Sequence, residues 1–397
     1  MQPINYLKPS LTLASVSMLR MFGFFLLMPI LSFLANKLQY ASQFNIGMAL
    51  GIYGLIQAFF YFPLGILSDK IGRKPVIYCG LLLLFLGAVL AANTSNVYIL
   101  ILARAIQGIG AISSVLSAFT ADIIPIQHRT KAMMMIGIGV GISFPMSLIA
   151  APILYNNFGQ SGIFYTVALS SITAGFFIYL LPNIKNNNQA FLGVKKSLNL
   201  IIHNKPMHPW LIGVFFLHIL SMMFFYIISF ILQSKNIILA DQWKFYLPIL
   251  TISFILAAKI IKNLEKQKRN IQISYISIVC LAIANLGLIF TSSISIYSFS
   301  ILVLIYFTGF NILEIFQPSI LSKLSNAQTK GATMGVYYSI QSLGMFCGAV
   351  SAGIASRFAD IYGMDKAFII FSLSLLFVVL WIAYSIKNSK NNLLIKG

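Results

Sequence analysis

The sequence contains few charged residues, and very few of these are acidic. Asp, Glu, Lys and Arg make up 9% of its 397 residues, and only seven residues are Asp or Glu. A soluble domain carries about 25% charged residues, so this chain has too little polar surface to face water. Hydrophobic residues account for 59% of the chain, and its mean hydropathy is +0.89. These values exclude an ordinary soluble domain and indicate that the lipid bilayer is its solvent.

Cysteine is also scarce, and the familiar patterns of catalytic residues are missing. Cys79, Cys280 and Cys347 lie far apart inside apolar runs, which fits neither a disulfide framework nor a metal site. We find no nucleophile–base pair, no cluster of metal ligands and no Gly-rich loop leading into a helix that could hold a nucleotide. The sequence therefore predicts no enzyme, no primary pump, no cofactor and no bound metal.

The net charge of +20 does not indicate a nucleic-acid partner, because Lys and Arg lie in short loops and form no basic face. Between the loops, continuous apolar runs are long enough to cross a bilayer as helices, since a crossing takes about 20 residues. Their length and lack of alternation exclude strands. We expect an all-α membrane protein with twelve transmembrane helices, near residues 11–36, 44–67, 75–92, 97–124, 132–156, 161–182, 208–234, 243–261, 271–290, 295–322, 331–356 and 364–386.

The distribution of Lys and Arg between the loops predicts the orientation in the membrane. If the N-terminus is cytoplasmic, twenty of the 27 lie on the cytoplasmic side and two lie inside spans. The other five lie on the opposite side, namely Lys37, Lys235, Lys244, Arg357 and Lys366. Both termini are therefore expected in the cytoplasm. The first span is too long for a cleaved signal peptide, so we expect it to be retained.

The longest polar connection, residues 183–207, divides the spans six and six. Residues 129–133 (RTKAM) open the fifth span and residues 329–334 (TKGATM) open the eleventh, half a chain later. This pattern fits two pseudo-symmetric six-helix bundles. We expect an N-terminal bundle at 1–182, a cytoplasmic linker at 183–207 and a C-terminal bundle at 208–397.

Several motifs carry a family resemblance. The stretch 65–74 (GILSDKIGRK) is a charged turn between two apolar runs, and it resembles the loop between helices 2 and 3 of the major facilitator superfamily of secondary transporters. Residues 104–110 (RAIQGIG) resemble a second motif of that superfamily. Residues 311–323 and 330–337 resemble its YajR-type branch of bacterial inner-membrane proteins, which are classed with drug–proton antiporters.

The resemblance covers residues 11–386 and implies a multi-pass monomer in the bacterial inner (plasma) membrane that works by alternating access. Longer members of the branch carry a soluble domain after the twelfth helix, which we expect this chain to lack. Residues 137–152 are similar to the antiporter motif of the superfamily, except that Ala151 stands where a Gly precedes the Pro.

For the loop at 65–74 the resemblance implies a latch that gates the cytoplasmic side. Gly65 and Gly72 would allow close packing and a tight turn. Asp69 would lie at the start of the eleventh helix, and Arg73 would pair with Asp122 at the end of the fourth span. Lys74 completes the motif. The alternative is a plain hairpin with solvated charges.

Ionisable residues inside spans are rare and costly, so each is a candidate for function. Glu314 in the tenth span is the expected proton carrier, with His218 in the seventh span as a second candidate. Arg20 and Arg104 stay protonated and would organise the cavity rather than cycle a proton. The alternative for each is a structural role, with Glu314 tied to Asn311, Gln317 or a cation. The two arginines would then be bonded to backbone carbonyls, and His218 would be packed and satisfied.

We expect the substrate cavity to be lined by cationic, amide and aromatic side chains. Aromatic rings suit amphipathic cations or planar organic compounds, although in a chain with 14% aromatic residues such clusters also arise by chance. The expected lining comprises Arg20, Arg104, Gln107, Asn311, Phe225, Tyr226 and Tyr337.

Three functions remain open at this point. The first is proton-coupled efflux of a small-molecule substrate, namely an amphipathic organic compound. The second is a proton symporter or uniporter that imports a small nutrient or an organic anion, because the first span holds Arg20 and no acid. The third is a membrane sensor or scaffold that does not transport.

Overall fold

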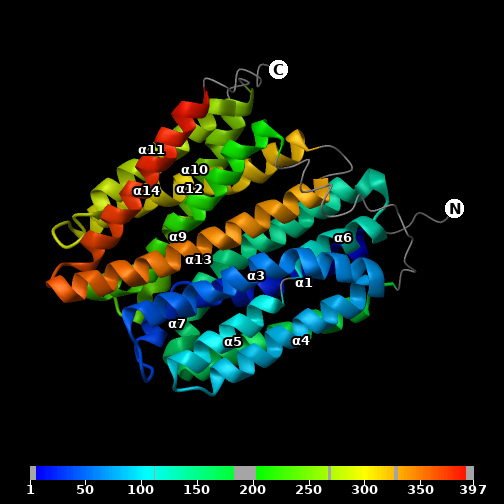
Figure 1. Ribbon diagram of the computed structural model, residues 1–397, viewed down its shortest axis with the longest axis horizontal. Coiled ribbons are helices and arrows are strands. Elements are labelled where there is room, and N and C mark those ends of the chain that lie inside the picture. The colour runs from blue at the N-terminus through cyan, green and yellow to red at the C-terminus, as the bar shows by residue number, and fades with distance from the viewer. Residues whose placement is uncertain (1–5, 111, 183–202, 267–269, 326–329, 390–397) are drawn as a thin grey trace. The chain divides into compact units, whose positions relative to one another are not determined.

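A computed structural model describes residues 6–110, 112–182, 203–266, 270–325 and 330–389. These residues are almost entirely helical and contain no strand, only one isolated bridge between Gln39 and Asn96. Figure 1 shows the helices, which are α1 (Leu7–Leu27), α2 (Leu31–Ala35), α3 (Gln43–Ile71), α4 (Arg73–Ala92), α5 (Val97–Ile109), α6 (Ser113–Ile123), α7 (Ile126–Tyr179), η1 (Lys205–Met207), α9 (His208–Ser234), η2 (Leu239–Asp241), α10 (Gln242–Lys266), α11 (Asn270–Leu288), α12 (Ile296–Leu324), α13 (Lys330–Tyr362) and α14 (Lys366–Ser389).

Ten stretches of the described chain are long and apolar enough to cross a membrane, and Gln272–Leu288 is a shorter apolar helix. One of the ten, Gln127–Tyr179, has 53 residues. At about 1.5 Å per residue it would extend roughly 80 Å, well beyond the ~30 Å of a bilayer core. Inside it Gly159 has φ 63°, ψ −155°, a conformation that favours glycine and interrupts the helix between the expected fifth and sixth spans. With this stretch counted as two spans and with Gln272–Leu288 added, each of the twelve expected spans has a counterpart among the described residues.

Two of the expected spans are broken helices. The first divides into α1 and α2 around Pro29, whose ring nitrogen cannot donate a helical hydrogen bond. The fourth divides into α5 and α6, and Gly110 caps the end of α5 with φ −68°, ψ 29°. Pro63, Pro145, Pro152, Pro248 and Pro318, in contrast, lie inside helices that continue past them.

The chain forms two compact units. Unit 1 comprises residues 1–41 and 52–191, and unit 2 comprises residues 42–51 and 192–397. Helix α3 belongs to both, because its first residues belong to unit 2 and the remainder to unit 1. Most of the expected linker at 183–207 falls outside the described residues, and η1 lies in the part that is described.

Glycine lets helices approach closely within each unit. In unit 1, a Cβ at Gly108 of α5 would lie 2.7 Å from the Tyr53 carbonyl oxygen of α3. In unit 2, a Cβ at Gly344 of α13 would meet the carbonyl oxygen of Phe215 and would lie 3.2 Å from Cβ of His218, both on α9. Small residues are the usual means of close helix packing in membranes. Both close approaches are made by helices that carry candidate functional residues.

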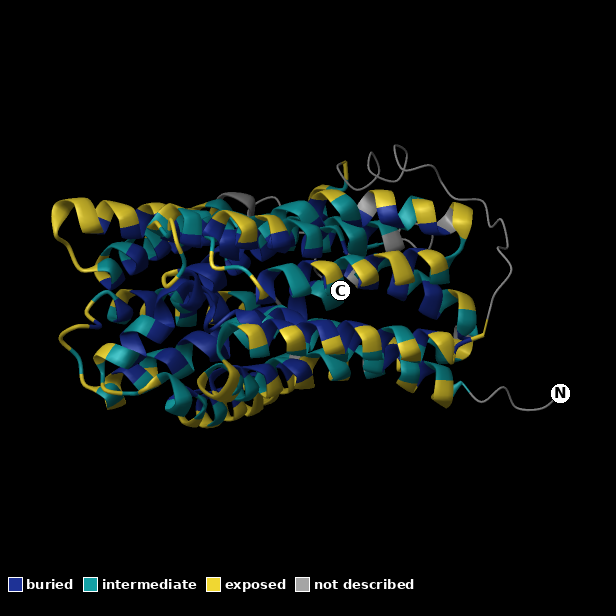
Figure 2. Ribbon diagram, turned by 90° about the horizontal axis from the view of Figure 1, so that it is seen from below, coloured by how far each residue is buried: buried dark blue, intermediate teal, exposed yellow. Residues whose placement is uncertain are grey.

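Burial differs strongly among the helices (Figure 2). In the most apolar 18-residue stretch of the span that includes α9, 83% is buried, whereas in the corresponding stretch of α14 33% is buried. Helix α9 packs against α12, α13 and α14, so it forms the centre of unit 2. Exposed Leu, Ile and Phe side chains on the other helices, such as Leu82, Leu169 and Phe254, are what a surface facing lipid requires.

Candidate functional site

Polar and ionisable side chains gather at three places inside the units. The first is a pocket in unit 1 lined by Leu19, Arg20, Gly23, Phe24, Tyr53, Leu84, Arg104, Gln107, Val167, Ser170 and Ser171. Its volume is about 10 Å³, about the room that one water molecule takes. Helices α1, α3, α4, α5 and α7 supply these residues.

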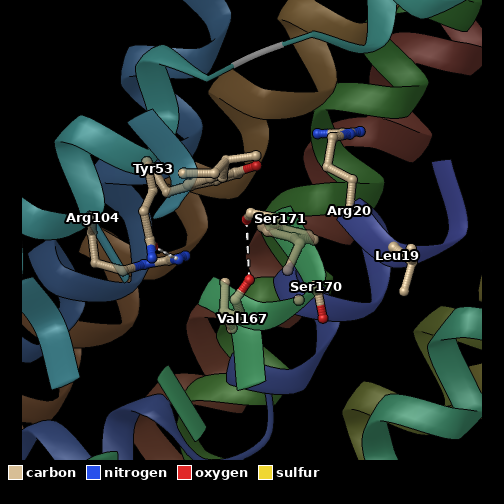
Figure 3. Close-up of a pocket in the computed structure, with 11 residues that line it drawn as sticks. Leu19, Arg20, Tyr53, Arg104, Val167, Ser170 and Ser171 are labelled. Atoms are coloured by element: carbon tan, nitrogen blue, oxygen red, sulfur yellow. Dashed lines mark hydrogen bonds between the residues drawn. The ribbon is translucent and has the colours of Figure 1, made fainter. Parts of the chain in front are cut away.

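Arg104 and Gln107 lie three residues apart on α5 and therefore on one helix face. Arg104 is 2% exposed, and its Nη1 donates a hydrogen bond to Gln107 Oε1 at 2.7 Å. Its guanidinium carbon lies 4.6 Å from the centre of the Tyr53 ring, a cation–π contact. Figure 3 shows Arg104 beside Tyr53. These contacts leave Arg104 Nε and Gln107 Nε2 without a hydrogen-bond partner among the described residues.

Arg20 on α1 contributes the second cation of the pocket. Its Nη2 donates to Ser113 Oγ on α6 and lies 3.0 Å from Met21 Sδ. Its Nε and Nη1 are buried and have no partner among the described residues. The guanidinium lies apart from that of Arg104 in Figure 3. The serines of the pocket donate to their own helix, Ser170 to Thr166 and Ser171 to Val167.

The second place is a cluster in unit 2 made by His218 of α9, Glu314 of α12 and Gln341 of α13. His218 is 3% exposed, and its Nδ1 lies 2.9 Å from the Val214 carbonyl oxygen. A carbonyl oxygen only accepts, so Nδ1 carries hydrogen. Nε2 of a neutral His218 is then an acceptor, and Gln341 Nε2 donates to it at 2.7 Å.

Glu314 joins the same cluster through both carboxyl oxygens. Gln341 Nε2 donates to Oε1 at 3.3 Å, and Oε2 lies 3.5 Å from His218 Nε2. The Glu314 side chain is 38% exposed, whereas that of His218 is 4% exposed. Glu314 is thus the more exposed partner of the buried imidazole, and both side chains are of types that can hold a proton.

The third place is the charged turn at 65–74 in unit 1. The expected pairing of Arg73 with Asp122 is confirmed, since Nε lies 2.8 Å from Oδ2. Arg73 Nη1 also donates to Ser68 Oγ at 2.7 Å. Gly72 has φ 102° between α3 and α4, where a side chain would be strained, and it forms the tight turn.

Other residues of this turn have separate surroundings. Lys74 Nζ donates to the Leu181 carbonyl oxygen at 2.5 Å. At Gly65 an added Cβ would meet no described heavy atom within 4 Å, so no close packing there requires glycine. The side chain of Asp69 lies outside the described residues, and so does its expected position at the eleventh helix.

The structure distributes the expected cavity residues over both units. Arg20, Arg104 and Gln107 line the unit 1 pocket. In unit 2, Asn311 donates to Ser253 Oγ of α10 at 3.0 Å. Three aromatic residues of unit 2 are each 1% exposed and pack inside it, namely Phe225, Tyr226 and Tyr337.

The contacts of the aromatic residues are specific. Phe225 packs against Phe224 and Phe307. The hydroxyl of Tyr226 donates to Gln43 Oε1 at 2.8 Å. Tyr337 belongs to an apolar core with Met207, Leu211, Val214 and Leu321.

Sequence reasoning missed Gln341 and Tyr53. Each is a polar or aromatic residue inside an apolar span, as are many others in this chain, so no pattern separates them. Only the packing of α13 on α9 and of α5 on α3 reveals their roles. Among the described residues, no group of three His, Cys, Asp or Glu side chains could hold a metal ion.

Comparison with known proteins gives a consistent result. The family model described as Major Facilitator Superfamily matches residues 13–349. The inner membrane transport protein YajR of Escherichia coli (strain K12) is 34% identical over 358 residues, which cover 89% of this chain and 79% of that protein. An uncharacterized transporter of Buchnera aphidicola subsp. Acyrthosiphon pisum is 36% identical over 353 residues, which cover 87% of this chain and 90% of that protein.

More distant similarities cover less sequence or only the fold. The class E tetracycline resistance protein of Escherichia coli is 33% identical over 150 residues, 36% of each chain. Among solved structures, a bacterial homolog of the human lysosomal transporter Spinster, inward-facing and unoccupied, has a TM-score of 0.77 at 13% identity. The match covers 98% of both chains and shows that the fold is shared.

Proposed function

The chain belongs to the Major Facilitator Superfamily, and we propose that this membrane transporter couples the entry of protons to the efflux of amphipathic organic compounds. The observation that carries the proposal is the cluster of His218, Glu314 and Gln341 in unit 2. A carboxylate and an imidazole within 3.5 Å of each other, inside an apolar helical unit, are what a proton relay requires.

The cluster has two chemically distinct states. With His218 neutral, one Gln341 amide N–H group donates to His218 Nε2 and the other to Glu314. With a proton on Nε2, the imidazole becomes a donor that faces the Gln341 amide nitrogen at 2.7 Å, and two donors cannot share a hydrogen bond. The Gln341 amide then has to rotate, either away from Nε2 or until its oxygen accepts from it, and the imidazolium pairs with Glu314. Arrival of a proton thus changes the contact between α9 and α13.

The turn at 65–74 supplies the gate in this proposal. The ion pair of Arg73 and Asp122 joins the α4 start to the α6 end, and Lys74 ties α4 to the chain after α7. We propose that Gly65, Asp69 and Gly72 complete a latch that opens and closes with the transport cycle. Sequence similarity to a tetracycline resistance protein supports efflux rather than import.

We further propose that the protein is a monomer of the bacterial inner membrane with both termini in the cytoplasm. We place the substrate site of this proposal at Arg20, Arg104 and Gln107, which line the unit 1 pocket, whereas Phe225, Tyr226 and Tyr337 are each 1% exposed and pack inside unit 2. The surplus of Lys and Arg in the expected cytoplasmic loops supports the orientation.

The test uses the purified full chain in liposomes that contain a trapped pH-sensitive dye. A panel of lipophilic cations, dyes and organic anions is added under an imposed proton gradient, to the wild type and to Glu314→Gln. Asp241→Asn is the matched control, because Asp241 pairs with Lys244 at an exposed site. We expect at least one compound to trigger proton movement in the wild type and the control but not in Glu314→Gln. Tracer transport without proton movement, unchanged in Glu314→Gln, would overturn proton coupling and favour a uniporter or an importer of anions.

A further inference from the structure

The pocket of unit 1 contains two cations and no acid. Its eleven lining residues include Arg20 and Arg104 but neither Asp nor Glu. Four of its donor atoms are buried and have no partner among the described residues, namely Arg20 Nε, Arg20 Nη1, Arg104 Nε and Gln107 Nε2. An Arg side chain offers five N–H donors and no acceptor, so these groups can be satisfied only by an acceptor that enters the pocket.

No acid of unit 1 lies near enough to neutralise these cations. Residues 1–41 and 52–191 contain only Asp69 and Asp122 as acids. Asp122 is paired with Arg73. Asp69 lies sixteen residues after Tyr53 on α3, roughly 24 Å along the helix axis at 1.5 Å per residue.

The neutral partners of the two arginines compensate their charge only in part. Arg104 has Gln107 and the face of Tyr53, and Arg20 has Ser113 and Met21. None of these carries a full negative charge. Buried charges in proteins are paired as a rule, because removing a cation from water is costly unless an anion accompanies it. In a transmembrane unit the same requirement is stronger.

We propose that this pocket binds a small anionic group that accepts hydrogen bonds from the free N–H groups of Arg20 and Arg104. The volume of about 10 Å³ admits one atom or the end of one group, not an entire organic molecule. The occupant is therefore a chloride ion or the carboxylate end of a longer ligand whose remainder lies outside. This inference rests on the proposed substrate site at Arg20, Arg104 and Gln107 and names the chemistry of its ligand, and it needs none of the residues of the His218 cluster.

The experiment places the purified full chain in lipid nanodiscs at fixed ionic strength, kept constant with a bulky sulfonate buffer. Sodium chloride and sodium acetate are titrated separately, and the midpoint of thermal unfolding is measured by calorimetry. Chloride binding is measured in parallel by chlorine-35 NMR line broadening. The variants are Arg20→Gln, Arg20→Lys and Arg104→Gln, with Arg357→Gln as the control, because Arg357 is an exposed cation of α13.

We expect saturable stabilisation by at least one of the two anions in the wild type and in Arg357→Gln. Apparent affinity should fall about tenfold or more in Arg20→Gln and Arg104→Gln, since each loses charge-assisted hydrogen bonds, and should fall less in Arg20→Lys. If chloride stabilises the protein, the natural occupant is a free ion. If only acetate stabilises it, the occupant is the carboxylate group of a larger ligand. The proposal would be overturned if neither anion stabilised the wild type saturably and if chlorine-35 line broadening were equal in the wild type and Arg20→Gln. The stabilisation result comes from the wild type, so it holds even if a variant folds poorly. The Glu314→Gln assay is independent of this result, so the two proposals fail separately.

Discussion

Replacing Gln341 by Met should change the pH dependence of proton-coupled transport. The Gln341 amide donates to His218 Nε2 at 2.7 Å and to Glu314 Oε1 at 3.3 Å. Met has a similar length and no donor. In the orientation that the structure shows, the amide N–H stabilises the form of His218 whose Nε2 is unprotonated, because a protonated Nε2 would face it as a second donor. Loss of the amide therefore favours protonation of the cluster.

The size of the effect follows from the hydrogen bonds that are lost. A net contribution of about 0.5–1.5 kcal/mol for the bond to Nε2 corresponds to about one pH unit at most, since 1.36 kcal/mol equals one unit. The midpoint of the pH dependence should therefore move to higher pH by about half a unit to one unit. Proton flux in liposomes, measured across a series of external pH values, reports that midpoint.

Gln317→Met is the matched control. Gln317 is a buried glutamine of α12 with 1% exposure, and its Oε1 has no hydrogen-bond partner among the described residues. We expect its midpoint to equal that of the wild type. If the pH midpoint of Gln341→Met equals that of the wild type or lies below it, the proposed role of the Gln341 amide in the His218–Glu314 cluster is refuted.

The remaining predictions concern packing, the turn and the ion pair. Gly108→Ala should lower the free energy of unfolding by about 1–3 kcal/mol, the usual cost of overpacking, because the added Cβ would lie 2.7 Å from the Tyr53 carbonyl oxygen. Thermal unfolding measures this change. The control variant Gly141→Ala should be as stable as the wild type, because its Cβ would meet no described heavy atom within 4 Å. Gly72→Ala should cost about 1–2 kcal/mol because φ is 102°, in a region that L-residues avoid; equal unfolding midpoints for Gly72→Ala and wild type would contradict it. Asp122→Asn should change the free energy of unfolding by less than about 1 kcal/mol, because the ion pair with Arg73 is partly exposed and the Asp122 side chain is 37% exposed. The same variant should transport much more slowly. Full transport activity in the variant would show that the ion pair does not act as a latch.

The sequence predicts the helical spans well where the backbone of the apolar run stays helical, even when the run contains a proline or a glycine, as Pro209 and Gly213 in α9 do. Residues 208–234 were expected as one span, and α9 runs from His208 to Ser234. Residues 11–36 and 97–124 were each expected as one span, and the structure divides them near Pro29 and Gly110. Apolar side chains continue through both breaks. The hydropathy of the sequence therefore gives no sign of the interruption, which lies in the backbone conformation.

The sequence predicted which residues belong to the candidate site better than it predicted how they are arranged in space. Arg73 and Asp122 were expected to pair, and they do. Glu314 and His218 were each expected as candidates for proton exchange, but their proximity depends on how α12 and α9 pack. The role of Gln341 depends in addition on the close approach at Gly344. No spacing within a single chain segment encodes contacts among three helices that are far apart in sequence.

The central claim, that Glu314 exchanges the coupled proton, is tested most directly by proton release on ligand binding. Purified protein in weakly buffered detergent solution with a pH indicator receives the compound that triggers proton movement in liposomes. The wild type and Asp241→Asn should release protons on binding, and Glu314→Gln should bind the compound without release. Equal proton release from Glu314→Gln and the wild type would contradict the claim.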